Sequence, residues 1–407
     1  MRRLACLCLV LSSLTVWAAT RPRYGGTLRI QLIGMFPNSD SVPLVSETLV
    51  RVDERGEFVP LLARGWQADG DKKRWRFIIR SKVVTPGAVA SALSDFFKKT
   101  SPDVTVTSTA QTVVIQSDRP MPDLLEKLAQ TEMGIPGTGP FRLSKWEEGH
   151  RAVLEANEDY PGGRPFVDVV EFTAAAPRSA YQLSAADIWE LPVGVSRRAI
   201  PDGMRVWTST PLDLIALNLI NPEPGLRDAL SLSIDRAAIV NVLMQRRGEI
   251  ATGLLPQWLT GYEFLFAAPF DAARARQAAV ALKNRSLVMR VPASDQLARL
   301  VADRVIVNAR DVGFTLQTGA NGNVEMVHVR LDCAGAGRAL REISGQAIAG
   351  DSSELLYRAE RAVLDQGRLI PIAHVPDVLG IGPRVRSSTG LPTCDLLSDI
   401  PNMWLAP

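Results

Sequence analysis

Short segments with a two-residue hydrophobic period recur along this chain, and segments with helical spacing lie between them. Leu28, Ile30 and Leu32 alternate with polar residues near the N-terminus, and RWRFIIR at 74–80 repeats the pattern. Such alternation predicts half-buried strands, whereas the spacing of AVASALSDFFKK at 88–99 predicts a helix. The repeated change of period indicates an α/β fold with at least two lobes.

The second half of the chain extends the same mixture. The nearly continuous apolar run DLIALNLI at 213–220 predicts a buried strand, and a long helical pattern covers 225–245. A strand, a helix and a second strand form a βαβ-like unit between 287 and 318. DSSE at 351–354 resembles a capping box, with Asp351 as the cap of the last long helix.

The N-terminus has the layout of a secretory signal peptide. Arg2 and Arg3 precede an apolar run, and Val16 and Ala18 are residues small enough for the positions before a cleavage site. We therefore predict that residues 1–18 are a signal peptide and that the protein is exported to the periplasm. An uncleaved anchor is the alternative interpretation. No run of 18 or more apolar residues recurs downstream, so we expect the mature chain to contain no membrane span.

Composition excludes several classes of partner. Cleavage after residue 18 removes two arginines and no acid, so the formal net charge falls from +3 to +1, which gives no indication of nucleic-acid binding. Cys333 and Cys394 survive cleavage, and they either form one disulfide or stay as two thiols. The histidines are His150, His328 and His374. No pair of them has metal-ligand spacing, so we expect neither a metal nor a cofactor.

No motif predicts catalysis, and we expect the protein not to be an enzyme. GTGPFRLSKWEEG at 137–149 lacks the Lys-Ser or Lys-Thr pair and the following helix of a phosphate-binding loop. We therefore interpret it as a tight turn into a strand with Phe141 and Leu143 on one face. VHVRLDCAGAGRALREI imitates a dinucleotide fingerprint, but Leu340 replaces the third glycine. There is no GxSxG elbow, and the apolar surround of His374 is typical of a core histidine.

Four motifs in order carry a family resemblance. They are YGGTLRI, GTGPFRLSKWEEG, ANEDYPGGRPFVDVVEF and LIALNLINPEPGLRDALSLSIDRAAIV. This series resembles the bacterial extracellular solute-binding proteins of family five, which include the oligopeptide-, dipeptide- and nickel-binding components of ABC importers. The resemblance implies a two-lobed periplasmic-binding-protein (Venus-flytrap) architecture with an additional small subdomain. After RSKVV at 80–84 the chain is shorter than the family pattern, so we expect a reduced small subdomain.

The resemblance also implies how the chain is divided. The expected parts are a signal peptide at 1–18, lobe I at 19–217 with the small subdomain at about 46–135, lobe II at 218–375, and a C-terminal segment at 376–407 that returns to lobe I. Two segments, near 213–220 and 370–378, are expected to cross between the lobes. Closure of two such lobes around a solute requires no covalent chemistry.

The resemblance implies that the protein functions as the substrate-binding component of a peptide-type ABC import system. It would capture a peptide or similar small solute between the lobes and deliver it to membrane permeases, and we expect a monomer. The expected ligand-binding residues are Met35, Phe36, Asn38, Asn218 and Asp332. Asp332 is included because peptide-binding relatives hold the amino terminus of a peptide with an aspartate in the segment that reads VRLDCAGAG here. An exported sensor or interaction scaffold that has lost transport is the alternative, and a secreted hydrolase ranks third.

Overall fold

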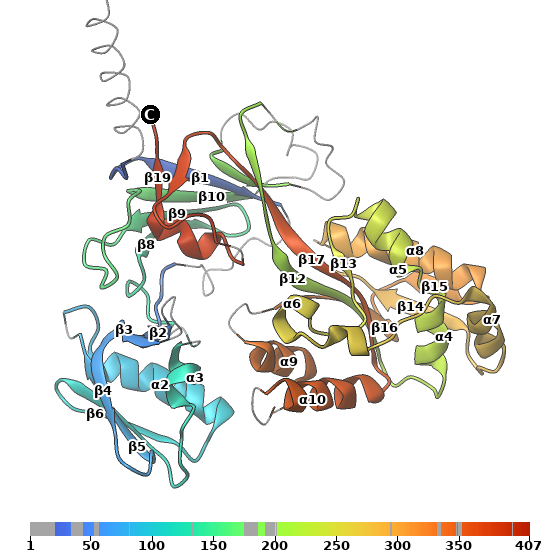
Figure 1. Cartoon of the computed structure of the whole chain (residues 1–407), viewed down its shortest axis with the longest axis horizontal. Coiled ribbons are helices and arrows are strands. Elements are labelled where there is room, and N and C mark those ends of the chain that lie inside the picture. The colour runs from blue at the N-terminus through green and yellow to red at the C-terminus, as the bar shows by residue number, and fades with distance from the viewer. Residues whose placement is uncertain are drawn as a thin grey trace, which may run out of the picture.

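Figure 1 shows the computed structural model of the chain, in which a long sheet runs through two lobes and a smaller subdomain lies below the first. The structure describes residues 21–33, 44–52, 57–80, 82–129, 131, 134–174, 186–191, 200, 202–293, 295–331, 335–346, 348, 352–392 and 394–407. The predicted signal peptide at 1–18 lies outside these residues. Within the described part of the chain, no helix is long and apolar enough to cross a membrane.

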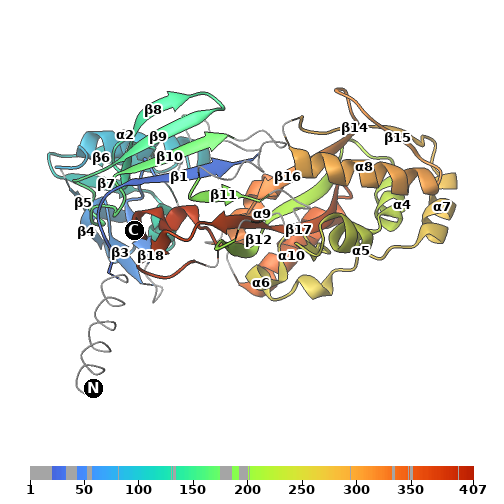
Figure 2. The ribbon, with the colours of Figure 1, turned by 90° about the horizontal axis from the view of Figure 1, so that it is seen from above.

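Two long strands connect the lobes. The 11-stranded sheet has the order β15-β14-β16-β12-β17-β11-β1-β10-β9-β8, with β13 paired to β17. Its longest members, β12 (Arg205–Leu219) and β17 (Leu369–Ile381), are antiparallel neighbours. Trp207 of β12 packs in the core of lobe I, whereas Ile215 of the same strand packs in the core of lobe II. Seen from above, the two lobes therefore lie at opposite ends of this strand pair (Figure 2).

Lobe I is built on the other strands at one end of the sheet and on the C-terminal segment. Its elements are β1 (Thr27–Leu32), β8 (Phe141–Glu147), β9 (Arg151–Ala156), β10 (Val169–Ala174), β11 (Ile188–Glu190), β18 (Val385–Ser387), η5 (Leu397–Asn402) and β19 (Met403–Leu405). β1 is parallel to both β10 and β11. Leu28 and Ile30 are completely buried beside Phe172, which confirms the alternation predicted for this strand. Met403 joins the same core.

The small subdomain has its own four-stranded sheet and core. Its elements are β2 (Val50–Val52), β3 (Phe58–Pro60), β4 (Ala63–Ala68), β5 (Arg74–Ile79), α2 (Pro86–Thr100), β6 (Thr105–Ser108), β7 (Thr112–Gln116) and α3 (Leu124–Ala129). The strand order is β4-β5-β7-β6. Trp75, Phe77 and Ile79 share the buried face of β5, as their alternation predicts. Pro86 suits the first turn of α2, and the Thr85 hydroxyl caps that turn.

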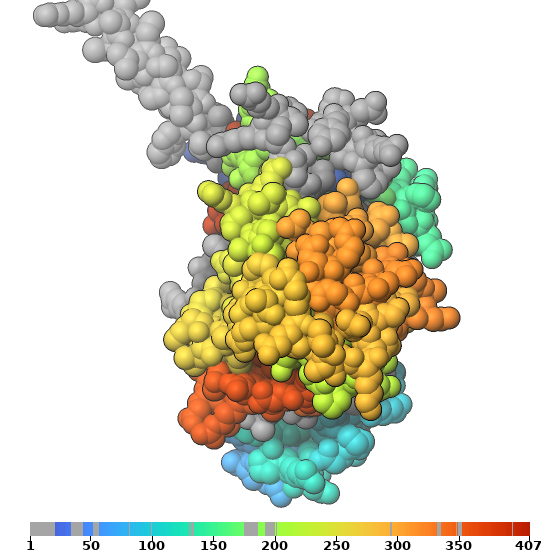
Figure 3. Space-filling model, turned by 90° about the vertical axis from the view of Figure 1, so that its right-hand side faces the viewer, coloured from blue at the N-terminus to red at the C-terminus, as the bar shows by residue number. Residues whose placement is uncertain are grey.

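Lobe II carries helices on both faces of its part of the sheet. Its elements are α4 (Leu226–Ser233), α5 (Arg236–Ala238), η3 (Ile239–Leu243), β13 (Glu249–Ile250), α6 (Gln257–Thr260), η4 (Glu263–Leu265), α7 (Ala272–Val280), β14 (Ser286–Arg290), α8 (Gln296–Asp311), β15 (Thr315–Thr318), β16 (Val324–Arg330), α9 (Ala336–Ser344) and α10 (Ser353–Asp365). β14 and β15 are parallel neighbours joined through α8, so the predicted βαβ unit is confirmed. Figure 3 views this lobe from its own end, with the cyan small subdomain beyond its lower edge.

The helical pattern at 225–245 does not form one helix, so that prediction is wrong. α4 ends at Ser233, and Asp235 then caps a new turn because its Oδ1 accepts the N–H of Ala238 at 2.8 Å. A short acidic side chain competes with the helix backbone in this way and favours a cap over a helix interior. The next segment, η3, is a π-helix.

One smaller prediction is also wrong. The cap of α10 is Ser352 rather than Asp351, because the Ser352 hydroxyl accepts the backbone N–H three residues later at 3.4 Å. On β8, Phe141 and Leu143 pair in regular register with Ala156 and Leu154, so they share one face as predicted, although Leu143 is 39% exposed. A bulge follows between Leu143 and Lys145, and an extra residue in one strand changes which face the next side chain occupies.

The GTGP motif is a turn that Asn157 holds in place, which confirms its interpretation as a structural loop. Asn157 is completely buried, and its Nδ2 donates to the carbonyl oxygens of Gly137 at 3.1 Å and Gly139 at 2.8 Å. Gly137 has a φ of +80°, a conformation that favours glycine. A Cβ on Gly139 would lie 2.3 Å from the carbonyl oxygen of Leu44, so only glycine fits.

Candidate functional site

Charged side chains gather where the strands of the two lobes join. We call this set the junction cluster, and its members are Glu190, Asp213, Asp295, His328, Arg330, Asp377 and Asp395. The sheet register explains part of this proximity. Asp213 on β12 pairs with Arg330 on β16 and, on its other side, with Val375 on β17. β17 also pairs with β11, and the last residue of β11 is Glu190.

Arg330 is the centre of the ion pairs. Its Nη1 and Nη2 donate to the two carboxylate oxygens of Asp377 at 3.0 and 2.6 Å, and Nη1 lies 3.7 Å from Asp213. Burial opposes the charge of Arg330, but the surrounding carboxylates, Asp377 first among them, raise its pKa above the ordinary value. This bidentate geometry is the strong form of an arginine–carboxylate pair. Arg330 and Asp377 are therefore held in fixed positions.

His328 lies between two carboxylates. Its Nδ1 is 2.6 Å from Oδ2 of Asp295, and its Nε2 is 3.8 Å from Oδ2 of Asp213. Asp295 also caps α8, because its Oδ1 accepts the N–H of Ala298 at 2.9 Å. Burial alone would lower the pKa of His328, but the two carboxylates outweigh burial and raise it to about 9. His328 is thus a cation at neutral pH. Burial would raise the pKa of Asp295, but the hydrogen bond and charge of His328 outweigh burial and lower it.

Glu190 and Asp395 complete the cluster from the side of lobe I. Glu190 accepts the N–H of Ile33 at 2.7 Å. Burial, with the nearby charges of Asp377 and Asp213, raises the pKa of Glu190 to about 7. Burial likewise raises the pKa of Asp395.

Cys394 precedes Asp395 in the chain and is disulfide-bonded. The interpretation of Cys394 as a free thiol is therefore wrong, while Cys333 lies outside the described residues. Asp395 accepts the N–H of Leu397 at 3.0 Å, so a bonded cysteine and a backbone turn both restrain this end of the cluster.

The junction cluster holds more acids than bases and is open to solvent. Five carboxyl groups face one arginine and one histidine, so negative charge is in excess. The side chains of Arg330, Asp377 and Asp213 are 41%, 27% and 14% exposed. Such a site can bind an ammonium group without burying an unpaired charge of its own. Among the described residues, no group of three or more histidine, cysteine, aspartate or glutamate side chains could hold a metal ion.

Asn218, a predicted site residue, is not part of the junction cluster. It lies five positions after Asp213 on β12, about 17 Å away along a strand at 3.3–3.4 Å per residue. An odd separation also places the two side chains on opposite faces of the sheet. The Nδ2 of Asn218 instead donates to Glu325 at 3.4 Å.

The other four predicted residues are Met35, Phe36, Asn38 and Asp332, and they lie outside the described residues. Their described neighbours in the chain border the junction cluster. Ile33 donates to Glu190, as described above, and Leu331 follows Arg330 and donates its N–H to the carbonyl oxygen of Leu212 at 2.6 Å. The assignment of these four residues to a ligand site stays a prediction.

Sequence reasoning missed all seven members of the junction cluster, although one signal was present. Asp213, His328, Arg330 and Asp377 interrupt segments that are otherwise apolar and that form strands. A charged residue inside a buried strand needs a partner, because an unpaired buried charge is costly. The pattern therefore indicates pairing, but it does not say which strands supply the partners.

Comparison with known sequences places the chain in a family. Residues 88–320 match the family model described as bacterial extracellular solute-binding proteins, family 5 Middle. The oligopeptide-binding protein AppA of Bacillus subtilis is 30% identical over 142 residues, which cover 32% of this chain and 26% of that protein. The probable D,D-dipeptide-binding periplasmic protein DdpA of Escherichia coli is 26% identical over 256 residues, covering 50% of this chain and 48% of that protein. The matched regions thus span about half or less of these relatives.

Solved structures match over nearly the whole chain. DppA from Helicobacter pylori, in complex with the peptide STSA, has a TM-score of 0.80 at 13% identity and covers 95% of this chain and 99% of its own. NikA from Staphylococcus aureus, in complex with Ni(L-His)2, has a TM-score of 0.72 at 14% identity. The match covers 93% of this chain and 98% of the NikA chain. These matches show the fold, which is the two-lobed periplasmic-binding-protein architecture.

Proposed function

Because the chain belongs to the bacterial extracellular solute-binding proteins of family 5, we propose that it is the substrate-binding component of a peptide-type ABC importer. It captures a peptide or a similar small solute between its lobes and delivers it to membrane permeases. The named functions of AppA and DdpA, and the peptide bound to DppA, support a peptide as the ligand. NikA has the same fold with a different ligand, so the ligand class must be argued from this chain's own residues.

The observation that carries the proposal is the excess of negative charge in the junction cluster. A peptide brings a free ammonium group at its amino terminus, and a carboxylate binds that group by a charge-assisted hydrogen bond. Asp377 and Asp213 are partly exposed and belong to lobe-connecting strands, whereas Asp395 is held beside them by lobe I. We expect Asp332, two residues after Arg330, to contribute a further carboxylate, with Met35, Phe36 and Asn38 contacting the rest of the ligand.

Lobe closure is the proposed signal to the permeases. β12 and β17 run through both lobes, and their pairing shifts register between Thr208 and Asp213. A register shift interrupts the hydrogen-bond ladder at this point, so we place the hinge there. A ligand that contacts both lobes stabilises the closed state by its differential affinity for that state.

Three further expectations belong to this proposal. The protein is exported through its N-terminal signal peptide, works as a monomer, and contacts permease subunits at the membrane. The division into lobe I at 19–217, lobe II at 218–375 and a returning segment at 376–407 also stays a prediction.

The test uses peptides that differ only at the amino terminus. Di- to pentapeptides with a free amino terminus are titrated into the protein, and N-acetylated versions serve as the control. Asp377→Asn removes one carboxylate of the junction cluster, and we expect at least about tenfold weaker binding of free peptides, which corresponds to about 1.4 kcal/mol. Asp365→Asn is the matched control variant, because Asp365 also pairs with an arginine, Arg361, but on the exposed side of α10.

Each outcome has a definite meaning. The proposal is supported if Asp377→Asn weakens the binding of free peptides, Asp365→Asn does not, and acetylated peptides bind weakly to the wild-type protein. Equal affinity for acetylated and free peptides would show that the cluster does not bind the ammonium group. If no peptide or small solute raises the melting temperature while a protein partner does, the transport function fails in favour of an interaction scaffold. Asp332→Ala should abolish binding of an amino-terminated ligand, and unchanged affinity would remove Asp332 from the site.

A further inference from the structure

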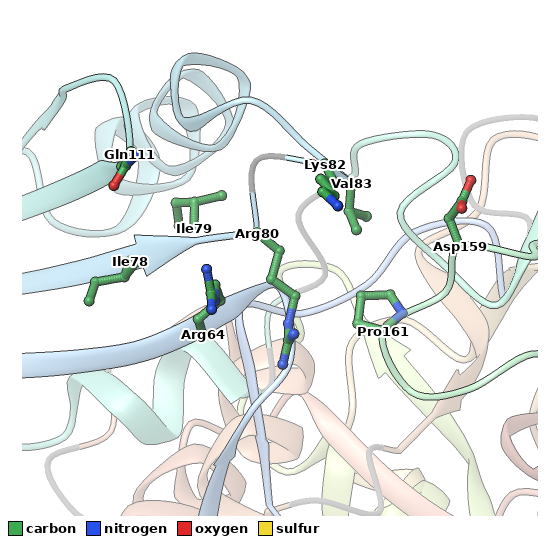
Figure 4. A pocket seen from close by; sticks show the side chains of 9 residues that line it. All are labelled: Arg64, Ile78, Ile79, Arg80, Lys82, Val83, Gln111, Asp159 and Pro161. Atoms are coloured by element: carbon green, nitrogen blue, oxygen red, sulfur yellow. The ribbon is translucent and has the colours of Figure 1, made fainter.

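A cavity of about 570 Å³ lies between the small subdomain and lobe I, and it shares no residue with the junction cluster. Its lining is Arg64, Ile78, Ile79, Arg80, Lys82, Val83, Gln111, Asp159 and Pro161. Figure 4 shows Arg64 and Arg80 beside the strands of the small subdomain, with Asp159 and Pro161 on the facing loop of lobe I. The volume is within the range of about 300–1,000 Å³ that is typical of small-molecule sites.

Arg64 points toward the cavity from a β-bulge. β4 and β5 pair at Ala63 with Ile79 and then at Gly65 with Ile78, so Arg64 is the additional residue of β4. A bulge changes the direction of a side chain and is frequent beside functional sites. Ile78, the residue opposite the bulge, is 46% exposed and gives the cavity an apolar surface.

Arg80 and Lys82 supply two more cations. The Nε of Arg80 donates to the carbonyl oxygen of Leu61 at 2.6 Å, which orients the guanidinium and leaves its two terminal nitrogens for a ligand. The backbone turn after Arg80 is closed by the N–H of Val83, which donates to the Arg80 carbonyl oxygen at 2.8 Å. Within the described residues, no carboxylate forms an ion pair with Arg64, Arg80 or Lys82.

The facing wall is hydrogen-bonded to Asn157, and its acid is already paired. Asp159 forms an ion pair with Arg142 at 3.2 Å. The N–H of Asp159 donates to the buried side chain of Asn157 at 3.2 Å, and the N–H of Tyr160 donates to the Asn157 carbonyl oxygen. Three cations and one acid line the cavity, which gives a formal charge of +2. Two guanidinium groups and an ammonium group beside an apolar surface match a doubly charged oxyanion with a small apolar substituent.

We propose that this cavity binds a soluble organic phosphate monoester as a second ligand, separate from the solute bound between the lobes. The phosphate group accepts from Arg64, Arg80 and Lys82, and its organic part packs against Ile78 and Val83. The proposal does not depend on the peptide function, because none of these residues belongs to the junction cluster.

Calorimetric titration with phenyl phosphate tests the proposal. At pH 8 this probe is a dianion, and benzoate serves as the monoanionic probe with the same ring. The double variant Arg64→Gln, Lys82→Gln removes two cations that have no ion-pair partner among the described residues, so its folding should be unaffected. Arg74→Gln is the matched control, since Arg74 is exposed at the other end of β5. Peptide titration and thermal unfolding of each variant show whether the protein is otherwise intact.

We expect saturable binding of phenyl phosphate that weakens at least about tenfold in the double variant, since charge-assisted hydrogen bonds are lost, and that is unchanged in Arg74→Gln. Benzoate should bind at least about tenfold more weakly than phenyl phosphate, and added salt should weaken phosphate binding. Three results overturn the proposal: no saturable binding at millimolar concentration, equal affinity in the double variant and wild type, or equal affinity for the two probes. A normal peptide response alongside any of these would leave the proposed importer function intact.

Discussion

Two regions of the molecule place a histidine beside carboxylates, and they solve the same electrostatic problem in different ways. In the junction cluster, Arg330 and His328 neutralise partly exposed aspartates. The second region, which we call the lobe II network, consists of Tyr262, Glu263, Glu360 and His374. Glu360 and His374 are completely buried. One region faces solvent and the other is part of the core of lobe II.

The partners of the carboxylates explain the difference. Glu360 accepts the N–H groups of Leu254 at 2.5 Å and Leu255 at 3.1 Å, and the hydroxyl of Tyr262 at 2.9 Å. Backbone N–H groups satisfy a buried acid without supplying a charge, and burial raises the pKa of Glu360 to about 7. In the junction cluster, by contrast, the aspartates pair with two cations, Arg330 and His328. Charge is therefore available to a ligand in the first region, while the second stabilises the fold.

Removal of Glu360 should have the largest effect on stability. Glu360→Ala leaves two N–H groups and one hydroxyl without a buried acceptor, so we expect a loss of about 3–5 kcal/mol in the free energy of unfolding. Asp377→Asn should cost only about 1 kcal/mol, because its ion pair is partly exposed. Denaturant unfolding of both variants measures the difference. Equal losses would remove the distinction between a structural network and a ligand-facing cluster.

The pH dependence of stability should differ between the regions. The pKa of Glu360 is raised from 4.5 to about 7, so its contribution is fully present below pH 4.5 and is lost as pH rises through 7. Glu360→Gln should remove a pH-dependent term of up to about 3 kcal/mol between these values. The pKa of His328 is raised from 6.5 to about 9, so its contribution is lost at higher pH, between 6.5 and 9.

Unfolding measured at several pH values between 4 and 9 checks this prediction. Glu354→Gln on α10 is the matched control, since Glu354 is exposed and pairs with Arg358. A wild-type curve that parallels the Glu360→Gln curve would show that Glu360 does not carry the raised pKa.

The smallest effect is expected for Asn218→Ala. The described hydrogen bond of its side chain, to Glu325, is long at 3.4 Å and partly buried, so we expect a change within about 0.5 kcal/mol in stability. Peptide affinity should also stay at the wild-type value, because Asn218 lies away from the junction cluster. A tenfold loss of peptide affinity in calorimetric titration would instead move the ligand site along β12.

Much of the fold could be predicted from local patterns. The alternation of Leu28 and Ile30, and of Trp75 and Phe77, gave strands with the correct buried faces, because side chains alternate between faces whatever the partner strand is. The pattern at 225–245 failed because Asp235 ends one helix and caps another turn. The spacing of hydrophobic residues does not reveal where a polar side chain competes for the backbone hydrogen bonds of a helix.

The site was much harder to predict. His328 and Arg330 could be recognised as charges within an apolar strand, but their partners come from Asp295, 33 residues earlier, and Asp377, 47 residues later. A pairing between distant segments depends on strand order and register, which one sequence does not specify. The choice of Asn218 over Asp213 shows the consequence, since both belong to one apolar run.

Local chemistry in the chain determined its α/β class, the glycine turn at Gly137, and the motifs of a solute-binding family, because these depend on the backbone and side chains of neighbouring residues. Only the tertiary structure decided that β12 and β17 pair across both lobes and bring Asp213, Arg330 and Asp377 together. The same holds for the cavity of Arg64 and Arg80, which exists only where the small subdomain meets lobe I. Electrostatic interactions depend on distance in space, and distance in space is a property of the folded chain.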